Sequence, residues 1–251
     1  MSIEIKNHKE TSVLLPKINH HLSELISSDW FDIDTWKLKN AVTGQSKGRY
    51  TTWFIGHHEG EWVLRHYYRG GLIARLIKDQ YFFNGMDKTR SYCELELLET
   101  MYLQGLPVPK PVAGRVIKSG IFYRNDILIE KIPNTQDLVQ RLQSEKLSEA
   151  RWHAIGSLVA KFHLAGIYHS DLNAHNILID NDSKFWLIDF DKCESRPLDN
   201  AWQQANLKRL KRSFGKESAI YDNFYYSDKN WHWLIQGYNH FAKKNFSDNL
   251  T

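Results

Sequence analysis

The chain has 251 residues but only two cysteines, six prolines and no long apolar run. Cys93 and Cys193 are too few for a disulfide framework, so we expect two buried thiols in a reducing compartment. No stretch approaches the roughly 18 consecutive apolar residues that a membrane-spanning helix requires, and residues 1–10 lack the apolar centre of a signal peptide. The sequence therefore predicts a chain that stays in the cytosol or on the inner face of a membrane.

A strong charge of one sign is also missing. Lys and Arg number 33 and Asp and Glu number 29, which gives a net charge of +4. This balance excludes a polybasic tail and a strongly acidic segment, but it allows small anions, phosphates or an anionic lipid surface as partners. Aromatic residues, in contrast, make up 13% of the chain. Such a surplus is typical of a bilayer interface, a ligand groove or a thick core, and composition leaves these three open.

The apolar pattern predicts three regions: an irregular extension over residues 1–40 with a helical candidate at 21–28, a strand-rich part over 41–132, and a helix-rich part over 133–251. In the strand-rich part we expect a turn-rich stretch at 43–48, strands at 50–56, 61–67, 112–117 and 121–132, and helices at 72–83 and 91–103. In the helix-rich part we expect a helix from Glu149 to about Ala165 capped by Ser148, strands at 177–179 and 185–190, and helices over 202–246.

Three polar residues in the last third of the chain have the spacing of a reactive site. Asp171 lies five residues before Asn176, and Asp189 lies thirteen residues after Asn176. Because Asn176 opens one predicted strand and Asp189 closes the next, a hairpin would bring them together. Two such oxygen ligands suit Mg²⁺, which leaves its other positions to water and phosphate. Asp171 could face the same point and take the proton of an attacking hydroxyl.

These residues resemble two motifs of the protein-kinase-like superfamily: the catalytic loop at 169–176 and the metal motif at 189–191. The resemblance implies an α+β, protein-kinase-like two-lobed fold, with an antiparallel-sheet N-lobe at 41–132 and a mainly helical C-lobe at 133–251. It also implies ATP and Mg²⁺, with Asp171 as the catalytic residue and Asn176 and Asp189 as metal ligands. We expect His169 to hold the loop by hydrogen bonding rather than to transfer protons.

Three residues depart from the protein-kinase pattern. Ser170 replaces the Arg of many regulated protein kinases, Asn173 stands where Lys is usual, and Asp191 replaces the Gly of the metal motif. No A-P-E motif follows Asp191. These departures point away from a protein substrate.

The resemblance also assigns nucleotide-binding positions in the first lobe. The loop from Gly44 to Gly48 is a candidate phosphate cover, and the backbone of Glu130 to Ile132 is the candidate hinge that binds adenine.

Arg65 falls where a strand lysine would contact phosphate. We expect it to pair with Glu94, with Glu96 as the alternative, because a guanidinium suits both carboxylate and phosphate. The competing interpretation is an ordinary arginine at a sheet edge.

A narrower resemblance is to the Kdo kinases of the lipopolysaccharide core kinase family, where Kdo is 3-deoxy-D-manno-octulosonic acid. It runs from about residue 41 to residue 214, and it rests on the blocks at 67–76, 105–111, 169–180 and 186–191. This resemblance implies transfer of the γ-phosphoryl group of ATP to a hydroxyl, expected to be O4, of Kdo in Kdo-lipid A. It further implies a peripheral place on the cytoplasmic face of the bacterial inner membrane, a glycolipid substrate, no nucleic acid and no obligate protein partner.

Candidate substrate contacts are less specific. Arg69 and Arg75 could bind the acidic sugar and lipid phosphates, or could belong to the charged face of an ordinary helix. His175 is either a substrate contact or a solvated loop residue. The basic run at 208–212 is either a solvated helix face or a contact with an anionic leaflet.

Other functions remain open at this point: a kinase for another sugar or an antibiotic, a protein kinase, or a catalytically dead binding module.

Overall fold

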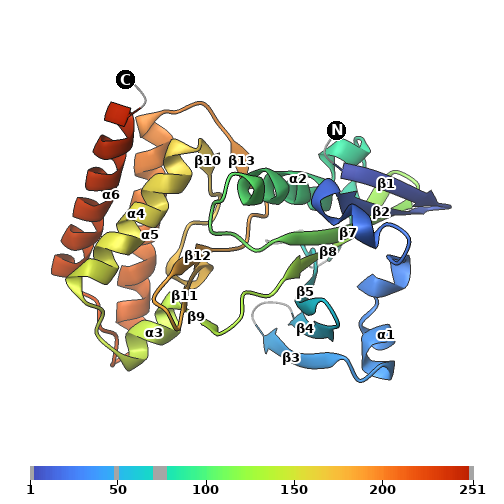
Figure 1. The fold of residues 1–251 in the computed structure, drawn as a ribbon, viewed down its shortest axis with the longest axis horizontal. Helices are drawn as coiled ribbons and strands as arrows, with labels where there is room; N and C mark the ends of the chain where they lie inside the picture. The colour runs from blue at the N-terminus through green and yellow to red at the C-terminus, as the bar shows by residue number, and fades with distance from the viewer. Residues whose placement is uncertain (1–2, 48–50, 70–77, 249–251) are drawn as a thin grey trace. The chain divides into compact units, whose positions relative to one another are not determined.

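An antiparallel sheet and a group of helices occupy different parts of the chain (Figure 1). The computed structural model describes residues 3–47, 51–69 and 78–248. The chain divides into unit 1, residues 1–104 and 109–132, and unit 2, residues 105–108 and 133–251. The α+β class expected from the sequence is confirmed.

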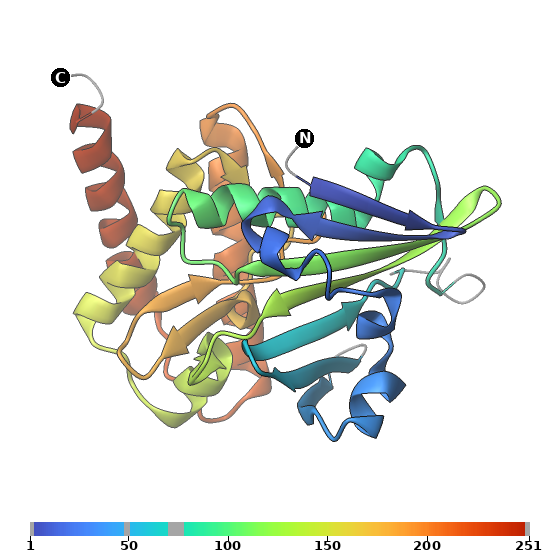
Figure 2. The same ribbon diagram turned by 45° about the vertical axis from the view of Figure 1, so that its right-hand side comes forward.

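Unit 1 is built on one antiparallel sheet with the strand order β1-β2-β7-β8-β5-β4-β3, and β6 pairs with β8 (Figure 2). Its strands are β1 (Ile3–His8), β2 (Thr11–Pro16), β3 (Val42–Lys47), β4 (Thr51–His57), β5 (Gly60–His66), β6 (Tyr81–Phe82), β7 (Pro111–Ser119) and β8 (Phe122–Glu130). Its helices are η1 (Lys17–Leu22), η2 (Ser28–Phe31), α1 (Ile33–Leu38), η4 (Met86–Lys88) and α2 (Arg90–Leu103). Helix α2 packs so closely on β7 that a Cβ at Gly114 would lie 2.8 Å from Leu95 Cδ1.

The first forty residues are not the irregular extension that we expected. Strands β1 and β2 pair with each other, and β2 also pairs with β7. Val13, Leu14 and Leu15 are all buried, so β2 is covered on both faces. A strand covered on both faces lacks the alternation of apolar and polar residues that marks a strand in a sequence.

Three further expectations in unit 1 were wrong. Gly44 lies in β3 opposite Phe54 rather than in a turn. The described end of the expected helix at 72–83 contains strand β6, and residues 72–77 lie outside the described residues. Cys93 is exposed, whereas Cys193 is buried as expected. The other strands expected at 50–132 and the helix at 91–103 are confirmed within a few residues.

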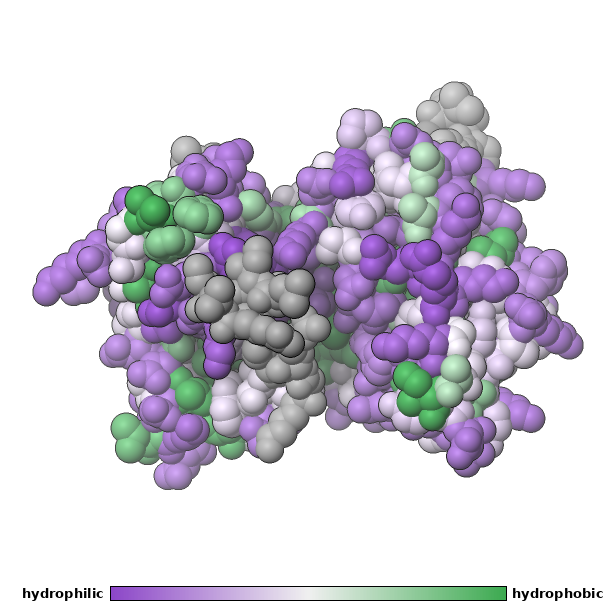
Figure 3. Space-filling view, turned by 180° about the vertical axis from the view of Figure 1, so that it is seen from behind, coloured by the Kyte–Doolittle hydropathy of each residue, from purple (hydrophilic) through white to green (hydrophobic). Residues whose placement is uncertain are grey.

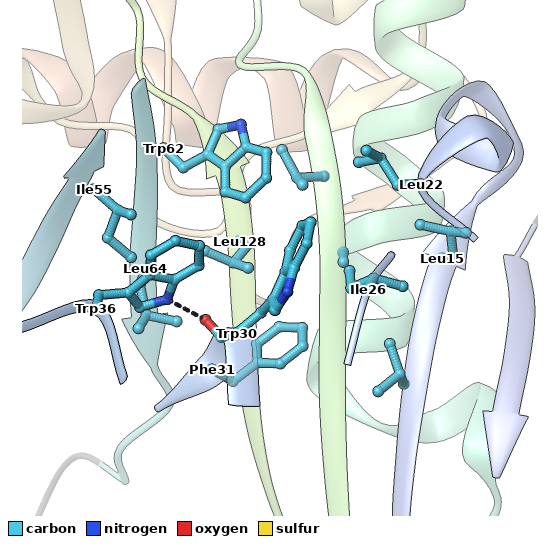
Figure 4. Packing of buried hydrophobic residues seen from close by; sticks show 13 residues of the cluster. Leu15, Leu22, Ile26, Trp30, Phe31, Trp36, Ile55, Trp62, Leu64 and Leu128 are labelled. Atoms are coloured by element: carbon cyan, nitrogen blue, oxygen red, sulfur yellow. Dashed lines mark hydrogen bonds between the residues drawn. The ribbon is translucent and has the colours of Figure 1, made fainter. Parts of the chain in front are cut away.

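An aromatic cluster on the sheet accounts for part of the aromatic surplus (Figure 4). Trp30 and Trp36 come from the segment between β2 and β3, and they pack against Trp62 of β5. The Nε1–H of Trp36 donates to the carbonyl of Trp30 at 2.7 Å. Because its polar atom has this partner, the Trp36 indole is buried without an unmet hydrogen bond.

Unit 2 combines helices with two small sheets, of order β12-β11-β9 and β10-β13. Its elements are β9 (Thr135–Asp137), α3 (Leu138–Ser144), α4 (Glu149–Leu164), β10 (Ile167–Tyr168), η5 (Ala174–Asn176), β11 (Ile177–Asp180), β12 (Phe185–Leu187), β13 (Glu194–Ser195), α5 (Asn200–Ile220) and α6 (Asp228–Asp248). The predicted cap of α4 is confirmed, because Ser148 Oγ accepts a hydrogen bond from the backbone N–H of Arg151.

Helices α4 and α6 touch through their backbones. A Cβ at Gly156 would lie 1.9 Å from the carbonyl oxygen of Leu234, and a Cβ at Gly237 would lie 2.2 Å from that of His153. Only glycine permits this approach. Helix α4 is followed directly by β10 and the segment that carries Asp171, so this crossing supports the position of that segment. Over the described residues, we find no helix with the length and apolar character needed to cross a membrane.

Candidate active site

The hairpin of β11 and β12 brings the predicted metal ligands to one end of a small sheet. Asn176 ends η5 immediately before β11, and Asp189 follows β12. Ile177 pairs with Leu187, and the backbone N–H of Ile188 donates to the carbonyl of Asn176 at 3.0 Å. The spacing in the sequence therefore predicted this juxtaposition correctly.

The loop between β10 and η5 is held by its own side chains. Asn173 Oδ1 accepts hydrogen bonds from the backbone N–H groups of His175 (2.9 Å) and Asn176 (3.2 Å). Asn173 Nδ2 donates to Asp171 Oδ2 at 3.2 Å. Asn176 Nδ2 donates to the carbonyl of Asp171 at 2.9 Å, which fixes the amide plane of Asn176. The loop thus sets the orientation of both Asp171 and Asn176.

His169 links this loop to the strand end before Asp189. Its Nδ1 accepts from the backbone N–H of Asp171 at 3.2 Å, so its Nε2 carries the proton and donates to the carbonyl of Ile188 at 3.0 Å. Burial lowers the pKa of His169, which keeps the ring neutral and able to serve both bonds. The ring also contacts Phe190. This geometry agrees with the expected structural role of His169.

Two further features concern the backbone beside the catalytic loop: the contacts of Ser170 and the conformation of Asp189. Ser170 Oγ donates to the carbonyl of Asp191 at 2.8 Å, and the Ser170 N–H lies 3.3 Å from Cys193 Sγ. Asp189 has a φ of 63°, in the left-handed region that residues other than glycine rarely adopt. Such conformations persist where the surrounding structure imposes them, and they are enriched at functional sites.

Two residues of α5 join the site, and the sequence analysis missed their roles. Asn206 is 1% exposed; its Oδ1 accepts from the backbone N–H of His169, and its Nδ2 donates to the carbonyl of His169. Arg209 Nη1 lies 3.4 Å from Asp171 Oδ1, at a carboxylate that is 62% exposed. A signal for Asn206 was present, because it lies on the apolar stripe of α5 with Leu210 and Phe214.

His175 lies between two carboxylates of unit 2. Its Nδ1 is 3.6 Å from Asp137 Oδ1, and its Nε2 is 3.5 Å from Glu217 Oε1. The carboxylate of Asp137, followed by the charge of Glu217, raises the pKa of His175. The ring is half exposed, and its predicted contact with substrate stays a prediction.

In unit 1, Arg65 pairs with Glu94, as expected. Arg65 Nη2 lies 2.5 and 2.6 Å from the two carboxylate oxygens of Glu94. Tyr67 Oη donates to the same carboxylate at 2.6 Å. Burial, followed by the charge of Glu94, raises the pKa of Tyr67 well above its ordinary value, so the phenol stays a donor.

The remaining candidate nucleotide positions differ in their surroundings. The N–H of Glu130 already donates to the carbonyl of Lys110 at 2.9 Å, and its carboxylate pairs with Lys110 Nζ at 3.2 Å. Ile132 is buried and is the last residue of unit 1. Gly44 lies in β3, and Gly48 lies outside the described residues.

The candidate substrate arginines are also in unit 1. Arg69 Nε donates to the carbonyl of Gln80, and its guanidinium lies 5.1 Å from the ring centroid of Tyr81. Arg75 lies outside the described residues.

Comparison with known proteins narrows the identity of the chain. The model of the lipopolysaccharide kinase (Kdo/WaaP) family matches residues 33–238. The 3-deoxy-D-manno-octulosonic acid kinase of Mannheimia succiniciproducens is 48% identical over 83% of this chain and 89% of that protein. The proteins of the same name from Vibrio vulnificus and Haemophilus influenzae are 45% and 46% identical, over 86% and 84% of this chain and 92% and 90% of their own lengths.

The match covers both units and includes Arg65, Glu94, Asp171, Asn176 and Asp189. The geometry of the loop from 169 to 176 and the sequence similarity along the chain both indicate a kinase. The chain belongs to the lipopolysaccharide kinase (Kdo/WaaP) family and is an ATP-dependent kinase.

Proposed function

We propose that this kinase transfers the γ-phosphoryl group of ATP to a hydroxyl, expected to be O4, of Kdo in Kdo-lipid A during assembly of the lipopolysaccharide inner core. The relatives named as Kdo kinases support the substrate. One structural observation supports the chemistry most directly: the carboxylate of Asp171 is exposed, yet its loop is held by His169 and Asn173.

We assign the two units to the two lobes of a protein-kinase-like fold. Unit 2 supplies the catalytic loop and the metal ligands. Unit 1 supplies the nucleotide contacts: Arg65 steadied by Glu94, the β3–β4 segment from Gly44 to Gly48, and the backbone near Ile132. The N–H of Glu130 donates to the carbonyl of Lys110, so the proposed hinge contact with adenine does not use this N–H, and the backbone from Glu130 to Ile132 stays our candidate.

The chain offers donors that fit a magnesium ion. Asn176 Nδ2 donates its hydrogen bond to the carbonyl of Asp171, and the other atom of the amide, Oδ1, can serve as a metal ligand. Asp189 adds a carboxylate at the end of the neighbouring strand. Over the described residues, no cluster of three or more His, Cys, Asp or Glu side chains could hold a metal alone. A site with two protein oxygens, completed by phosphates and water, is the pattern of Mg²⁺ in phosphoryl transfer. Bound there, Mg²⁺ would neutralise phosphate charge.

The protein groups position the acceptor and take its proton. The sugar hydroxyl donates to Asp171 and loses its proton to that carboxylate as its oxygen bonds to the γ-phosphorus. The bond from the γ-phosphorus to the bridging oxygen breaks, and ADP leaves. Arg209 and Asn173 each contact one oxygen of Asp171 and so orient the carboxylate for this step. Most of the rate enhancement comes from positioning and charge stabilisation.

We place the kinase on the cytoplasmic face of the bacterial inner membrane as a peripheral protein. The proposed acceptor is anchored there by its acyl chains, while ATP is dissolved in the cytosol. Arg69 and Arg75, together with His175, stay our candidates for contacts with the acidic sugar and its phosphates.

The proposal is tested by incubating Kdo-lipid A with the full-length protein, ATP and Mg²⁺ and following the lipid by mass spectrometry. We expect the gain of one phosphoryl group on Kdo. The gain should be lost in Asp171→Asn and kept in Asp182→Asn, which changes an exposed aspartate of the β11–β12 turn in the same unit. Phosphorylation of protein instead of lipid, or no transfer to either soluble or lipid-linked Kdo, would contradict the proposal.

A further inference from the structure

Four large apolar side chains, which we call the apolar tip, lie at the β7–β8 turn and at the neighbouring strand β6: Phe82 and Ile121, which are exposed, and Phe83 and Phe122, which are partly buried. Ile121 occupies a two-residue turn with Gly120, so the sheet cannot cover its side chain, and it is 66% exposed. Phe82 of β6 is 61% exposed. On the face shown in Figure 3, apolar residues form separate groups among hydrophilic ones.

The apolar tip is a fixed structure rather than a set of unrelated side chains. Phe82 pairs with Phe122 across β6 and β8, and their ring centroids lie 4.9 Å apart. The backbone N–H of Phe83 donates to the carbonyl of Ile121 at 2.9 Å. The ring of Phe83 packs edge-on against Tyr123, which is buried. The sheet therefore already holds these side chains in place at its end, so ordering them on binding to another surface would cost little conformational entropy.

Basic residues lie at the same end of the sheet as the apolar tip. Lys118 is exposed, and its Nζ lies 4.7 Å from the ring centroid of Phe83. The N–H of Lys118 donates to the carbonyl of Glu10, which brings the β1–β2 turn and its exposed Lys9 to the same end of the sheet. Lys78, also exposed, precedes β6. Two acids lie at the same end: Asp79 pairs with Arg124 at 3.0 Å, and Glu10 of the β1–β2 turn is exposed.

We propose that the apolar tip inserts into an anionic lipid bilayer, with Lys9, Lys78 and Lys118 contacting the headgroups. A group of aromatic and aliphatic side chains at the end of a sheet, with lysines nearby, matches a bilayer interface, where apolar atoms enter the acyl region and cations meet anionic headgroups. A single exposed apolar residue such as Leu38, which stands between the exposed Lys37 and Lys39, presents one apolar side chain rather than a group. The inference rests on the proposed function only in that the acceptor is embedded in a membrane.

The test is flotation of the full-length protein with vesicles of phosphatidylcholine, with and without phosphatidylglycerol, in the absence of substrate. We expect binding to the anionic vesicles. The double variant Phe82→Ser with Ile121→Ser should lower the partition coefficient roughly tenfold or more. Leu38→Ser, at a side chain that is 86% exposed, is the matched control and should leave binding within about twofold of wild type. Lys118→Glu should weaken binding only to the anionic vesicles.

The two proposals fail separately. Equal vesicle binding by the wild type and the double variant, or no binding by the wild type, overturns the docking role of the tip even if Kdo-lipid A is phosphorylated. Tip-dependent binding without phosphorylation of Kdo overturns the proposed function alone. The double variant should phosphorylate a soluble Kdo acceptor at the wild-type rate, and loss of this activity would also count against a pure docking role.

Discussion

Removing the guanidinium of Arg65 should leave the buried carboxylate of Glu94 without its arginine partner. Glu94 is 2% exposed and accepts from Arg65 at 2.5 and 2.6 Å and from Tyr67 at 2.6 Å. Breaking a buried ion pair by removing one partner costs about 3–5 kcal/mol, and we expect the lower end because the side chain of Arg65 is 22% exposed. For a chain of this size, about 3 kcal/mol lowers the melting temperature by roughly 6–12 °C.

The assay is thermal and urea unfolding of Arg65→Met beside Arg124→Met. Arg124 pairs with Asp79 at 3.0 Å, but its side chain is 47% exposed, so its loss should cost about 0–1 kcal/mol. Arg65→Met should also raise the KM for ATP, since we assign a phosphate contact to Arg65.

A double variant separates stability from catalysis. Arg65→Met combined with Glu94→Leu removes both charges and should recover much of the lost stability, because an apolar pair carries no desolvation cost. Phosphoryl transfer should not recover. The reasoning fails if Arg65→Met costs no more than Arg124→Met, or if the double variant is as unstable as the two single losses added together.

Three further predictions concern unit 2. Burial lowers the pKa of His163 from 6.5 to about 4, so the unfolded chain binds the proton more tightly than the folded one. The free energy of unfolding should therefore be highest above pH 6.5 and fall by about 3 kcal/mol as the pH drops to about 4. Urea unfolding of His163→Phe should lack this loss. Asn206→Ala leaves the N–H and C=O of His169 unpaired, which should cost about 1–3 kcal/mol in urea unfolding and lower kcat more than it changes the KM for ATP. The added Cβ of Gly156→Ala would push α4 away from α6 and should lower the free energy of unfolding by roughly 3 kcal/mol or more. An unchanged midpoint in urea unfolding would refute this prediction.

The sequence predicted the catalytic segment well because its chemistry is local. Asp171, Asn176 and Asp189 lie within nineteen residues, and two short strands with one turn are enough to bring the last two together. The pairing of Arg65 with Glu94 was also predicted, since a strand and a helix with recognisable patterns carry the two residues.

What the sequence did not reveal depends on tertiary burial. Strand β2 has no alternation because both of its faces are covered. The spacing of Asn206 with Leu210 and Phe214 indicates a buried position, but it does not identify the backbone of His169, which is 37 residues away, as the partner of the amide. Arg209 joins Asp171 across a similar separation. Local patterns do not record which buried groups need a partner from another element.

The close approach of α4 and α6 at Gly156 and Gly237 makes catalysis depend on a part of the chain that is remote from the reacting residues. Helix α6 comes after all the residues that we assign to the reaction, yet its Gly237 fixes how near it can lie to α4. Helix α4 ends at Leu164, only a few residues before His169. Selection for transfer activity should therefore also act on two positions that touch no substrate. In a library of random variants, Gly156 and Gly237 should tolerate fewer replacements than many residues lining the site, such as the half-exposed His175.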